Sequence, residues 1–309
     1  MMIKDKQRNK LHKQAKRFFA SHYFGLGQMK TKETNLIHGR RTYVEQIRII
    51  SKAANDLNVK RLKSITPKMA QDYLNNCRNK GLSQKYLSNI KVALERLVFI
   101  QEPNKKLQRV EAIPKYETPL TDKDRAYTND QINAVMEHLS PMAQLSTLLA
   151  LNGGLRVEEI LTLQRVNEAE ASKARQWDNR RFTGRTLGER YIVTGKNGLR
   201  REVMIDSELA KTIESLRLET PKVIYDRGLS FEVRYDLLGG QKFSAAFSKA
   251  SYQALGWSYG AHGLRFSYAQ QRIDCELQDM PYSDAKLIVS QELGHFREEI
   301  TERYIEPYG

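Results

Sequence analysis

The chain has 309 residues, of which 40% are hydrophobic and 28% charged, a composition typical of a globular protein large enough for two domains. The sequence holds no apolar run near the roughly 20 residues that a membrane-spanning helix needs, and no secretory signal follows its basic start. Its two cysteines, Cys77 and Cys275, are too few for a disulfide framework or a metal cluster. We therefore expect a protein of the reducing cytoplasm.

The positive charge is concentrated in the first two-fifths of the chain. The formal net charge is +15, and residues 1–120 hold 26 Lys and Arg against 9 Asp and Glu, whereas residues 121–309 hold 25 against 27. Neutralisation of phosphates with release of their counterions supplies sequence-independent affinity for nucleic acid. A solvated surface would have the same composition, but the one-sided distribution favours a nucleic-acid partner for the first 120 residues.

Helical periodicity begins at residue 3 and predicts a basic amphipathic helix over 3–24, within a basic N-terminal extension of residues 1–30. This helix could lie on DNA, on its own protein or on a membrane, and the lack of a lipidation motif disfavours the membrane. Residues 31–103 are predicted as a small DNA-binding domain of three or four helices, with one at about 41–56, one that opens at Thr66-Pro67 and runs to about 78, and one that opens at Ser83 and carries inward apolar residues to Val98. The outer faces of these helices supply the predicted DNA-binding residues, which are Arg40, Arg41, Arg48, Lys85 and Lys91.

Residues 104–127 carry two prolines among charged residues and no sustained period, so we predict a linker. The larger domain, 128–309, begins at Thr128-Asn129-Asp130-Gln131, which has capping-box spacing. Helices are predicted at about 129–139, 141–151 and 157–163, a polar Arg-rich insertion at 167–188, and two short strands at 191–193 and 202–205. From residue 207 the pattern is helical almost to the end, at about 207–217, 243–255, 262–274, 283–293 and 298–306. The predicted fold is mainly α, with two domains and one small β-hairpin.

Six basic or hydroxyl-bearing side chains of the larger domain lie at predicted turns or helix ends. In chain order they are Arg156, Lys196, His262, Arg265, His295 and Tyr304. Each has a plain structural explanation, since arginines pair with nearby carboxylates, turn lysines face solvent, histidines cap helices and tyrosines anchor short helices. His262 and Arg265 are three residues apart and share a helical face. The complete set in this order favours one shared site.

The segments GGLRVEEILTL, TGKNG, AHGLRFSYA and LGHFREEITERYI resemble the motifs of the tyrosine recombinases, the family of phage integrases and chromosome-dimer resolvases. The resemblance covers roughly residues 34–306. It implies a mostly helical catalytic domain behind a DNA-binding bundle, and a nucleophilic tyrosine, Tyr304, surrounded by basic residues. The residues that it implies around Tyr304 are Arg156, Lys196, His262, Arg265 and His295, with Glu159 as the acid that supports the first arginine.

Attack by Tyr304 on a DNA phosphodiester would place extra charge on two non-bridging oxygens, which permanently protonated arginines stabilise. A phenol with an ordinary pKa of ~10 is mostly protonated at pH 7, so His262 is the predicted base. Lys196 would protonate the leaving 5′-oxygen, and His295 would bind the phosphate or position the tyrosine. The resulting 3′-phosphotyrosyl link conserves the bond energy, so no cofactor and no metal are expected.

The predicted function is site-specific DNA recombination, foremost as the integrase of a mobile genetic element, in the cytoplasm on the nucleoid. The expected partners are double-stranded DNA, three further copies of the chain in a homotetramer on two duplexes, and in some reactions a DNA-bending accessory protein. A chromosome-dimer-resolving recombinase, a type IB-like topoisomerase and a non-cutting DNA-binding regulator are the alternatives. The 167–188 insertion and an extended 274–279 stretch depart from the family pattern. Five residues follow Tyr304, which leaves its action in cis or in trans open.

Overall fold

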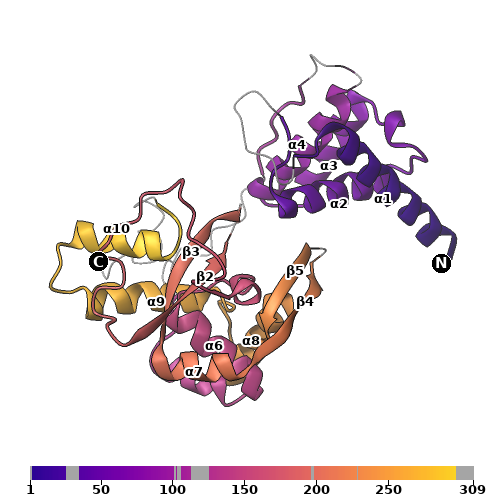
Figure 1. Ribbon diagram of the computed structural model, residues 1–309. Coiled ribbons are helices and arrows are strands. Elements are labelled where there is room, and N and C mark those ends of the chain that lie inside the picture. Colours follow the sequence, from indigo (N-terminus) through magenta and orange to yellow (C-terminus); the bar gives the residue numbers. More distant parts are fainter. Residues whose placement is uncertain are drawn as a thin grey trace. The chain divides into compact units, whose positions relative to one another are not determined.

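The computed structural model describes residues 2–25, 35–100, 102, 106–112, 125–195, 198–227 and 229–296. The chain divides into two compact units, Met1–Pro119 and Leu120–Gly309, which are coloured from indigo to magenta and from magenta to yellow in Figure 1. Each unit is described by itself. Most of the predicted linker, residues 113–124, lies outside the described residues.

The described part of the first unit is a helical bundle. Its helices are α1 (Met2–His22), α2 (Arg40–Asp56), α3 (Pro67–Asn79) and α4 (Gln84–Phe99), with a 3-10 turn, η1 (Leu62–Ser64). Two of these helices begin at side-chain caps, since Thr66 Oγ1 accepts from the Met69 amide at 3.2 Å and Ser83 Oγ accepts from the Tyr86 amide at 3.4 Å. These side chains satisfy amides that the first turn of a helix leaves unpaired.

Helix α1 packs on its own protein. Leu11, Ala15 and Phe19 recur at a four-residue spacing, which puts them on one helical face, and all three are buried in the same core as Ile50 of α2. Burial of such side chains stabilises a fold by about 25 cal/mol per Å² of apolar surface. Lys10, Lys13 and Lys16 of α1 lie outside this face and are exposed.

The second unit contains α5 (Asn129–Met136), α6 (Pro141–Asn152), α7 (Ser207–Ser215), α8 (Gly240–Leu255), α9 (Gly263–Gln271) and α10 (Tyr282–Glu292). The capping box at Thr128 and Gln131 is confirmed. Helix α9 continues into a π-helical turn, η4 (Arg272–Glu276), which ends two residues beyond the helix predicted at 262–274. The predicted helix over 157–163 is only a 3-10 turn, η2 (Glu159–Thr162).

Two antiparallel sheets complete the second unit. Strands β1 (Gln164–Arg165), β2 (Gly188–Thr194) and β3 (Arg200–Asp206) pair in that order, with Tyr191 opposite Val203. A separate hairpin joins β4 (Arg217–Asp226) to β5 (Leu229–Tyr235) and is seen beside α8 in Figure 1. The prediction of helices alone after residue 207 is wrong here. Most of β4 is exposed, so its sequence lacks the apolar alternation by which a half-buried strand is recognised.

The apolar core of the second unit lies among α5, α6, α8 and the inner face of β2 and β3. It includes Phe243 and Phe247 of α8, Leu149 of α6, and Val193 and Ile205 of the sheet. Among the described residues no helix is long and apolar enough to cross a membrane.

Candidate active site

Two helices of the second unit end in the same left-handed turn. After α6, Gly154 has φ +58°, and the Leu155 amide donates to the Ala150 carbonyl at 3.0 Å. After α10, Gly294 has φ +70°, and the His295 amide donates to the Ser290 carbonyl at 2.8 Å. This 6→1 bond is that of a Schellman motif, which favours glycine at the left-handed position. The motifs deliver Arg156 and His295 directly after the two helices.

The two turns lie against each other. A Cβ atom on Gly154 would lie 2.8 Å from Cδ1 of Tyr268 and 3.0 Å from Cδ2 of Leu293, the residue before Gly294. Distances under 3.0 Å do not occur between real Cβ atoms and their neighbours, so a larger residue here would push the turns apart. Glycine at 154 is therefore required both by its backbone angle and by this close approach.

Glu159 is the centre of the polar contacts between the turns. Its carboxylate, 1% exposed, accepts from the Arg156 amide at 2.9 Å, from Nη1 of Arg156 at 2.5 Å and from Nη2 of Arg201 at 2.8 Å, and Nη1 of Arg265 lies 3.6 Å away. Burial alone would raise the pKa of this carboxyl, but the guanidinium groups of Arg201, Arg156 and Arg265 outweigh it and hold the pKa well below its usual range. Glu159 is therefore ionised.

Arg265 and Arg201 fasten the two turns together. Both side chains are buried. Arg265 donates to the Gly154 carbonyl and, at 2.9 Å, to the Leu293 carbonyl, and Arg201 donates to the Gly154 carbonyl at 3.1 Å and to the Glu292 carbonyl. The last carbonyls of a helix lack intrahelical partners, and cations stabilise that end. The two arginines thus cap α10 from the side of the site.

Arg201 is missing from the residues predicted from the sequence. It lies on β3 with Val203 and Ile205, two and four residues further on, and so on the same face of the strand. A basic residue on the buried face of an otherwise apolar strand is a recognisable feature. The sequence carried this information, but it did not show which carboxylate would pair with the arginine.

His295 is half-buried and directly contacts Arg156, with Nη2 of the arginine 3.1 Å from Nε2 of the imidazole. Arginine has no acceptor, so Nε2 accepts and Nδ1 carries the proton in the neutral ring. Burial, followed by the charges of Arg265, Arg156 and Arg201, lowers the pKa of His295 to about 2. The imidazole is therefore neutral at pH 7 and can donate a hydrogen bond from Nδ1.

His262 lies at the rim of the cluster, immediately before α9, with its ring 5.9 Å from that of Phe266. The protein packed around the ring lowers its pKa to about 4, and the charges of Arg265 and Arg156 act in the same direction. The residue is exposed, so water screens part of this effect. A neutral imidazole at pH 7 is the form that can accept a proton.

Lys196 and Tyr304 lie outside the described residues. Gly195, the neighbour of Lys196, lies against the cluster, since a Cβ atom on it would be 2.7 Å from Oε1 of Glu159. The β2–β3 turn thus starts beside the paired Arg156 and Glu159. At the other end, Phe296 is the last described residue and follows His295 directly.

The predicted DNA-binding residues lie on α2 and α4 of the first unit. Arg40, Arg41 and Arg48 of α2 are exposed, as is Lys85 of α4. Lys91 is half-buried and pairs with Glu95 at 2.7 Å, so part of its charge is already compensated. No nucleic acid is present, and the role of these five residues stays a prediction.

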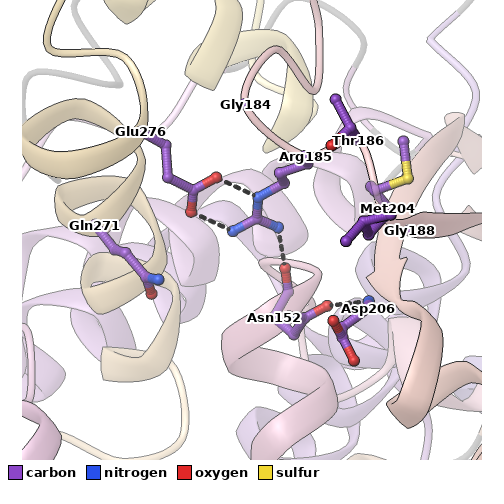
Figure 2. Close-up of a pocket in the computed structure, with 10 residues that line it drawn as sticks. Asn152, Gly184, Arg185, Thr186, Gly188, Met204, Asp206, Gln271 and Glu276 are labelled. Atoms are coloured by element: carbon purple, nitrogen blue, oxygen red, sulfur yellow. Dashed lines mark hydrogen bonds and ion pairs between the residues drawn. The ribbon is translucent and has the colours of Figure 1, made fainter.

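A hollow of about 260 Å³ in the second unit (Figure 2) is lined by residues that include Asn152, Arg185 and Glu276. Arg185 spans it, donating to both oxygens of Glu276 at 2.8 and 2.9 Å and to the Asn152 carbonyl. None of the predicted site residues lines this hollow.

The arrangement is suited to an anion. Arg156, Arg201 and Arg265 outnumber the single carboxylate that they share, and the Arg156 side chain is 26% exposed. Guanidinium groups bind phosphate oxygens with paired N–H donors. Within the described ranges no group of three His, Cys, Asp or Glu side chains could hold a metal ion.

No family model matches the chain, and no curated protein matches it significantly. Solved structures with a similar fold do exist. A lambda integrase dimer bound to a COC′ core site aligns with a TM-score of 0.54 and 15% identity over 90% of this chain and 92% of that chain. The Tn1549 transposon integrase in complex with a circular intermediate DNA has a TM-score of 0.51 and 13% identity over 94% of both chains.

The XerH site-specific recombinase bound to its difH substrate aligns with a TM-score of 0.50 and 15% identity, over 97% of this chain and 92% of that chain. These similarities extend over at least 90% of this chain and of each solved chain. The chain therefore has the fold of DNA recombinases and integrases, and its second unit has the fold of the tyrosine-recombinase catalytic domain. The mainly α fold class predicted from the sequence is confirmed.

Proposed function

We propose that this chain is a site-specific DNA recombinase that cleaves and rejoins DNA through a 3′-phosphotyrosyl link to Tyr304. The observation that carries the proposal is the convergence of Arg156, Arg265 and His295 around the buried carboxylate of Glu159. Those residues come from segments up to 139 positions apart in the chain. The similarity of the fold to DNA-bound integrases supports the same conclusion.

The proposed role of the arginines is to hold the scissile phosphate and stabilise its transition state. Arg156 is the partly exposed member, and its Nη2 beside His295 provides a donor edge for a non-bridging oxygen. Arg265 contributes its charge from a fixed position, since both of its Nη atoms are bonded to backbone carbonyls. Donors fixed before the reaction need no reorganisation when charge develops, which is the largest source of catalysis in many enzymes.

In the cleavage step the Tyr304 oxygen forms a bond to phosphorus, and the bond from phosphorus to the 5′-oxygen breaks. His262 takes the phenol proton, for which it must be neutral, and its lowered pKa satisfies this at pH 7. Lys196 gives a proton to the leaving 5′-oxygen. Attack by a 5′-hydroxyl on the phosphotyrosine reverses each transfer, so rejoining requires no oxidant, reductant or nucleotide.

Within the recombinases, we assign the chain to integration of a mobile genetic element, acting as a homotetramer on two duplexes in the cytoplasm. The first unit would supply DNA affinity through Arg40, Arg41, Arg48 and Lys85, with Lys91 adding to it when Glu95 is displaced. A DNA-bending protein is an optional partner in this scheme. Recombination of two DNA sites that flank an element would support this assignment, and resolution of chromosome dimers at one site would replace it.

The test is an incubation with nicked suicide substrates made from the DNA that flanks the gene. The wild-type chain is expected to form a covalent adduct that survives denaturing electrophoresis, and Tyr304→Phe is expected to form none. Tyr308→Phe is the matched control, since it removes a phenol four residues away and should leave the adduct intact. An adduct that persists in Tyr304→Phe, or DNA binding with no adduct in the wild type, would refute the recombinase proposal. Relaxation of any supercoiled plasmid, regardless of its sequence, would indicate a topoisomerase instead.

A further inference from the structure

The Arg-rich insertion between β1 and β2 uses its charges inside the protein. Three of its four arginines are paired with carboxylates of the same unit: Arg180 with Asp178 and Asp284 at 2.8 Å, Arg181 with Glu202 at 2.9 Å, and Arg185 with Glu276 at 2.8 Å. Charges that are already compensated contribute little to the binding of a polyanion. The composition of the insertion therefore points to a structural task.

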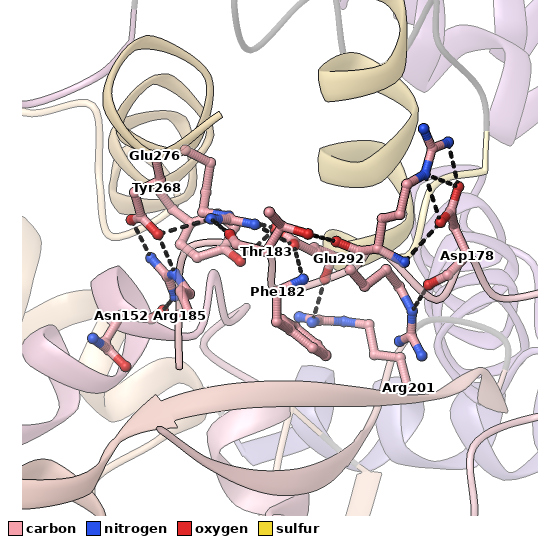
Figure 3. Close-up of polar contacts among 12 residues, drawn as sticks. Asn152, Asp178, Phe182, Thr183, Arg185, Arg201, Tyr268, Glu276 and Glu292 are labelled. Carbon is pink, nitrogen blue, oxygen red and sulfur yellow. Dashed lines mark hydrogen bonds and ion pairs between the residues drawn. The ribbon is translucent and has the colours of Figure 1, made fainter. Parts of the chain in front are cut away.

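The insertion is hydrogen-bonded to the last turn of α10. The Asp178 amide donates to Oε1 of Gln291 at 2.7 Å, and the Phe182 amide donates to Oε1 of Glu292 at 2.8 Å (Figure 3). Glu292 is buried and also accepts from two nitrogens of Arg272, at 2.7 and 2.9 Å, and from the Tyr268 hydroxyl at 2.8 Å. Because a buried carboxylate is stable only with all of its partners in place, these bonds resist displacement.

A second anchor lies at the other end of the insertion. Arg185 donates to the carbonyl of Asn152, the last residue of α6 (Figure 2). The Asn152 side chain in turn accepts from the Asp206 amide at 2.9 Å. The insertion is thus tied to α6 and α10, the two helices whose terminal turns deliver Arg156 and His295.

The insertion also holds the residue after His295. The Trp177 ring packs edge-on against the Phe296 ring, with centroids 4.7 Å apart and planes at 62°, and the Arg175 guanidinium lies 5.1 Å from the same ring. The Arg181 guanidinium lies over the Trp177 ring, 4.5 Å from its centroid. The backbone of Phe296 has φ +56°, a left-handed conformation that a bulky side chain adopts only when its surroundings impose it.

We propose that residues 175–182 form a clasp that sets the direction in which the chain leaves His295 toward Tyr304. This inference rests on the proposed function, and within it Trp177 and Phe296 are positioning residues that do not touch the DNA. The Schellman turn fixes the backbone of His295, and the clasp fixes the next residue, eight positions before Tyr304. Without the Trp177 ring, Phe296 would relax to an extended backbone, and the contact between His295 and Arg156 would loosen.

The catalytic test compares Trp177→Ala with the conservative Trp177→Phe, which keeps an aromatic ring against Phe296. In single-turnover assays on the suicide substrate, Trp177→Ala is expected to slow adduct formation roughly tenfold, the size expected for loss of an aromatic pair. The Kd for the same DNA should change less than twofold, because the first unit is untouched. Trp177→Phe should restore the rate to within about threefold. An equal loss in both variants, or a loss of DNA affinity in place of rate, would overturn the clasp.

A second measurement tests the contact between the clasp and Phe296 independently of DNA cleavage. The protein has two tryptophans, and Trp257 stacks on Tyr127 away from the insertion. A Trp257→Phe background therefore leaves Trp177 as the only indole reporter. Addition of Phe296→Ala should at least double the quenching of its emission by acrylamide, and Trp177→Ala should raise the pKa of His295 in an NMR titration. If both signals stay unchanged, the clasp is refuted. Absence of a wild-type adduct would refute the recombinase proposal alone.

Discussion

Replacement of Arg201 by methionine removes one guanidinium from the centre of the site while nearly keeping the volume of the side chain. In the native protein this group donates to Glu159 at 2.8 Å, to the Gly154 carbonyl at 3.1 Å and to the Glu292 carbonyl. The side chain is 1% exposed, so water cannot replace it at these acceptors. Arg201→Met therefore leaves three buried acceptors each short of a donor.

The expected loss of stability follows from these contacts. Breaking a buried ion pair by removing one partner typically destabilises by about 3–5 kcal/mol. Glu159 retains Arg156 and Arg265, which favours the lower end, whereas each buried carbonyl without its donor adds roughly 1–3 kcal/mol. Methionine packing in the same space offsets part of this through apolar burial. We therefore expect Arg201→Met to lower the free energy of unfolding of the second unit by about 4 kcal/mol.

Urea unfolding followed by tryptophan emission measures this loss. Both tryptophans, Trp177 and Trp257, lie in the unit Leu120–Gly309, so the emission reports on that unit. Arg200→Met is the matched control, because Arg200 is the exposed neighbour on the same strand and should change stability by less than ~0.5 kcal/mol. A loss below about 1 kcal/mol in Arg201→Met, or equal losses in the two variants, would show that the buried network does not hold the two turns together.

Four further outcomes are expected. The folded protein lowers the pKa of Glu159, so the ionised carboxylate stabilises the fold above the ordinary pKa of ~4.3, and this contribution is lost as the pH falls below that value. Glu159→Gln should therefore flatten the dependence of folding stability on pH between pH 5 and 3, in acid titrations monitored by circular dichroism. His295 has a folded pKa of about 2 against 6.5 in the unfolded chain, so the unfolded state takes up its proton first and stability falls as the pH drops below 6.5; His295→Gln should lessen that fall by up to ~1.4 kcal/mol per pH unit, and an unchanged profile would contradict the burial of this ring. Gly294→Ala should lower the free energy of unfolding, measured in urea, by about 1 kcal/mol or more, since φ is +70° and the new Cβ would lie 3.1 Å from the Arg201 side chain. In salt titrations of DNA binding, Lys85→Ala should lower the slope of log K against log salt by about 1, whereas the same slope as in wild type would remove Lys85 from the DNA-binding surface.

Features that depend on near neighbours were predictable from the sequence. The caps at Thr66, Ser83 and Thr128 lie within three residues of the amides that they satisfy. The Gly-Gly and Gly-His turns are likewise local, since a Schellman motif is closed by bonds within six residues. This is why Arg156 and His295 could be placed at helix ends before any tertiary contact was known, and why they meet through turns of the same type.

The tertiary structure decided which of these residues meet, and through which partners. Arg201 contacts Glu159 across 42 positions of the chain, and Phe182 contacts Glu292 across 110. Neither local propensity nor periodicity carries information over such separations. The sequence showed the arginines of the insertion, but their composition predicts a polar loop equally well whether their partners are DNA phosphates or carboxylates of the same unit.

The β4–β5 hairpin could not be predicted from the sequence for a different reason. Its strands pair with each other, and exposed residues such as Val223 and Tyr225 leave β4 without an inward apolar stripe. A periodic pattern arises only where one face of an element is buried. The sequence by itself therefore determined the helices, their caps and the order of the site residues. The shared carboxylate, the second buried arginine and the clasp exist only because folding brings distant charges into one low-dielectric interior, where each must find a partner.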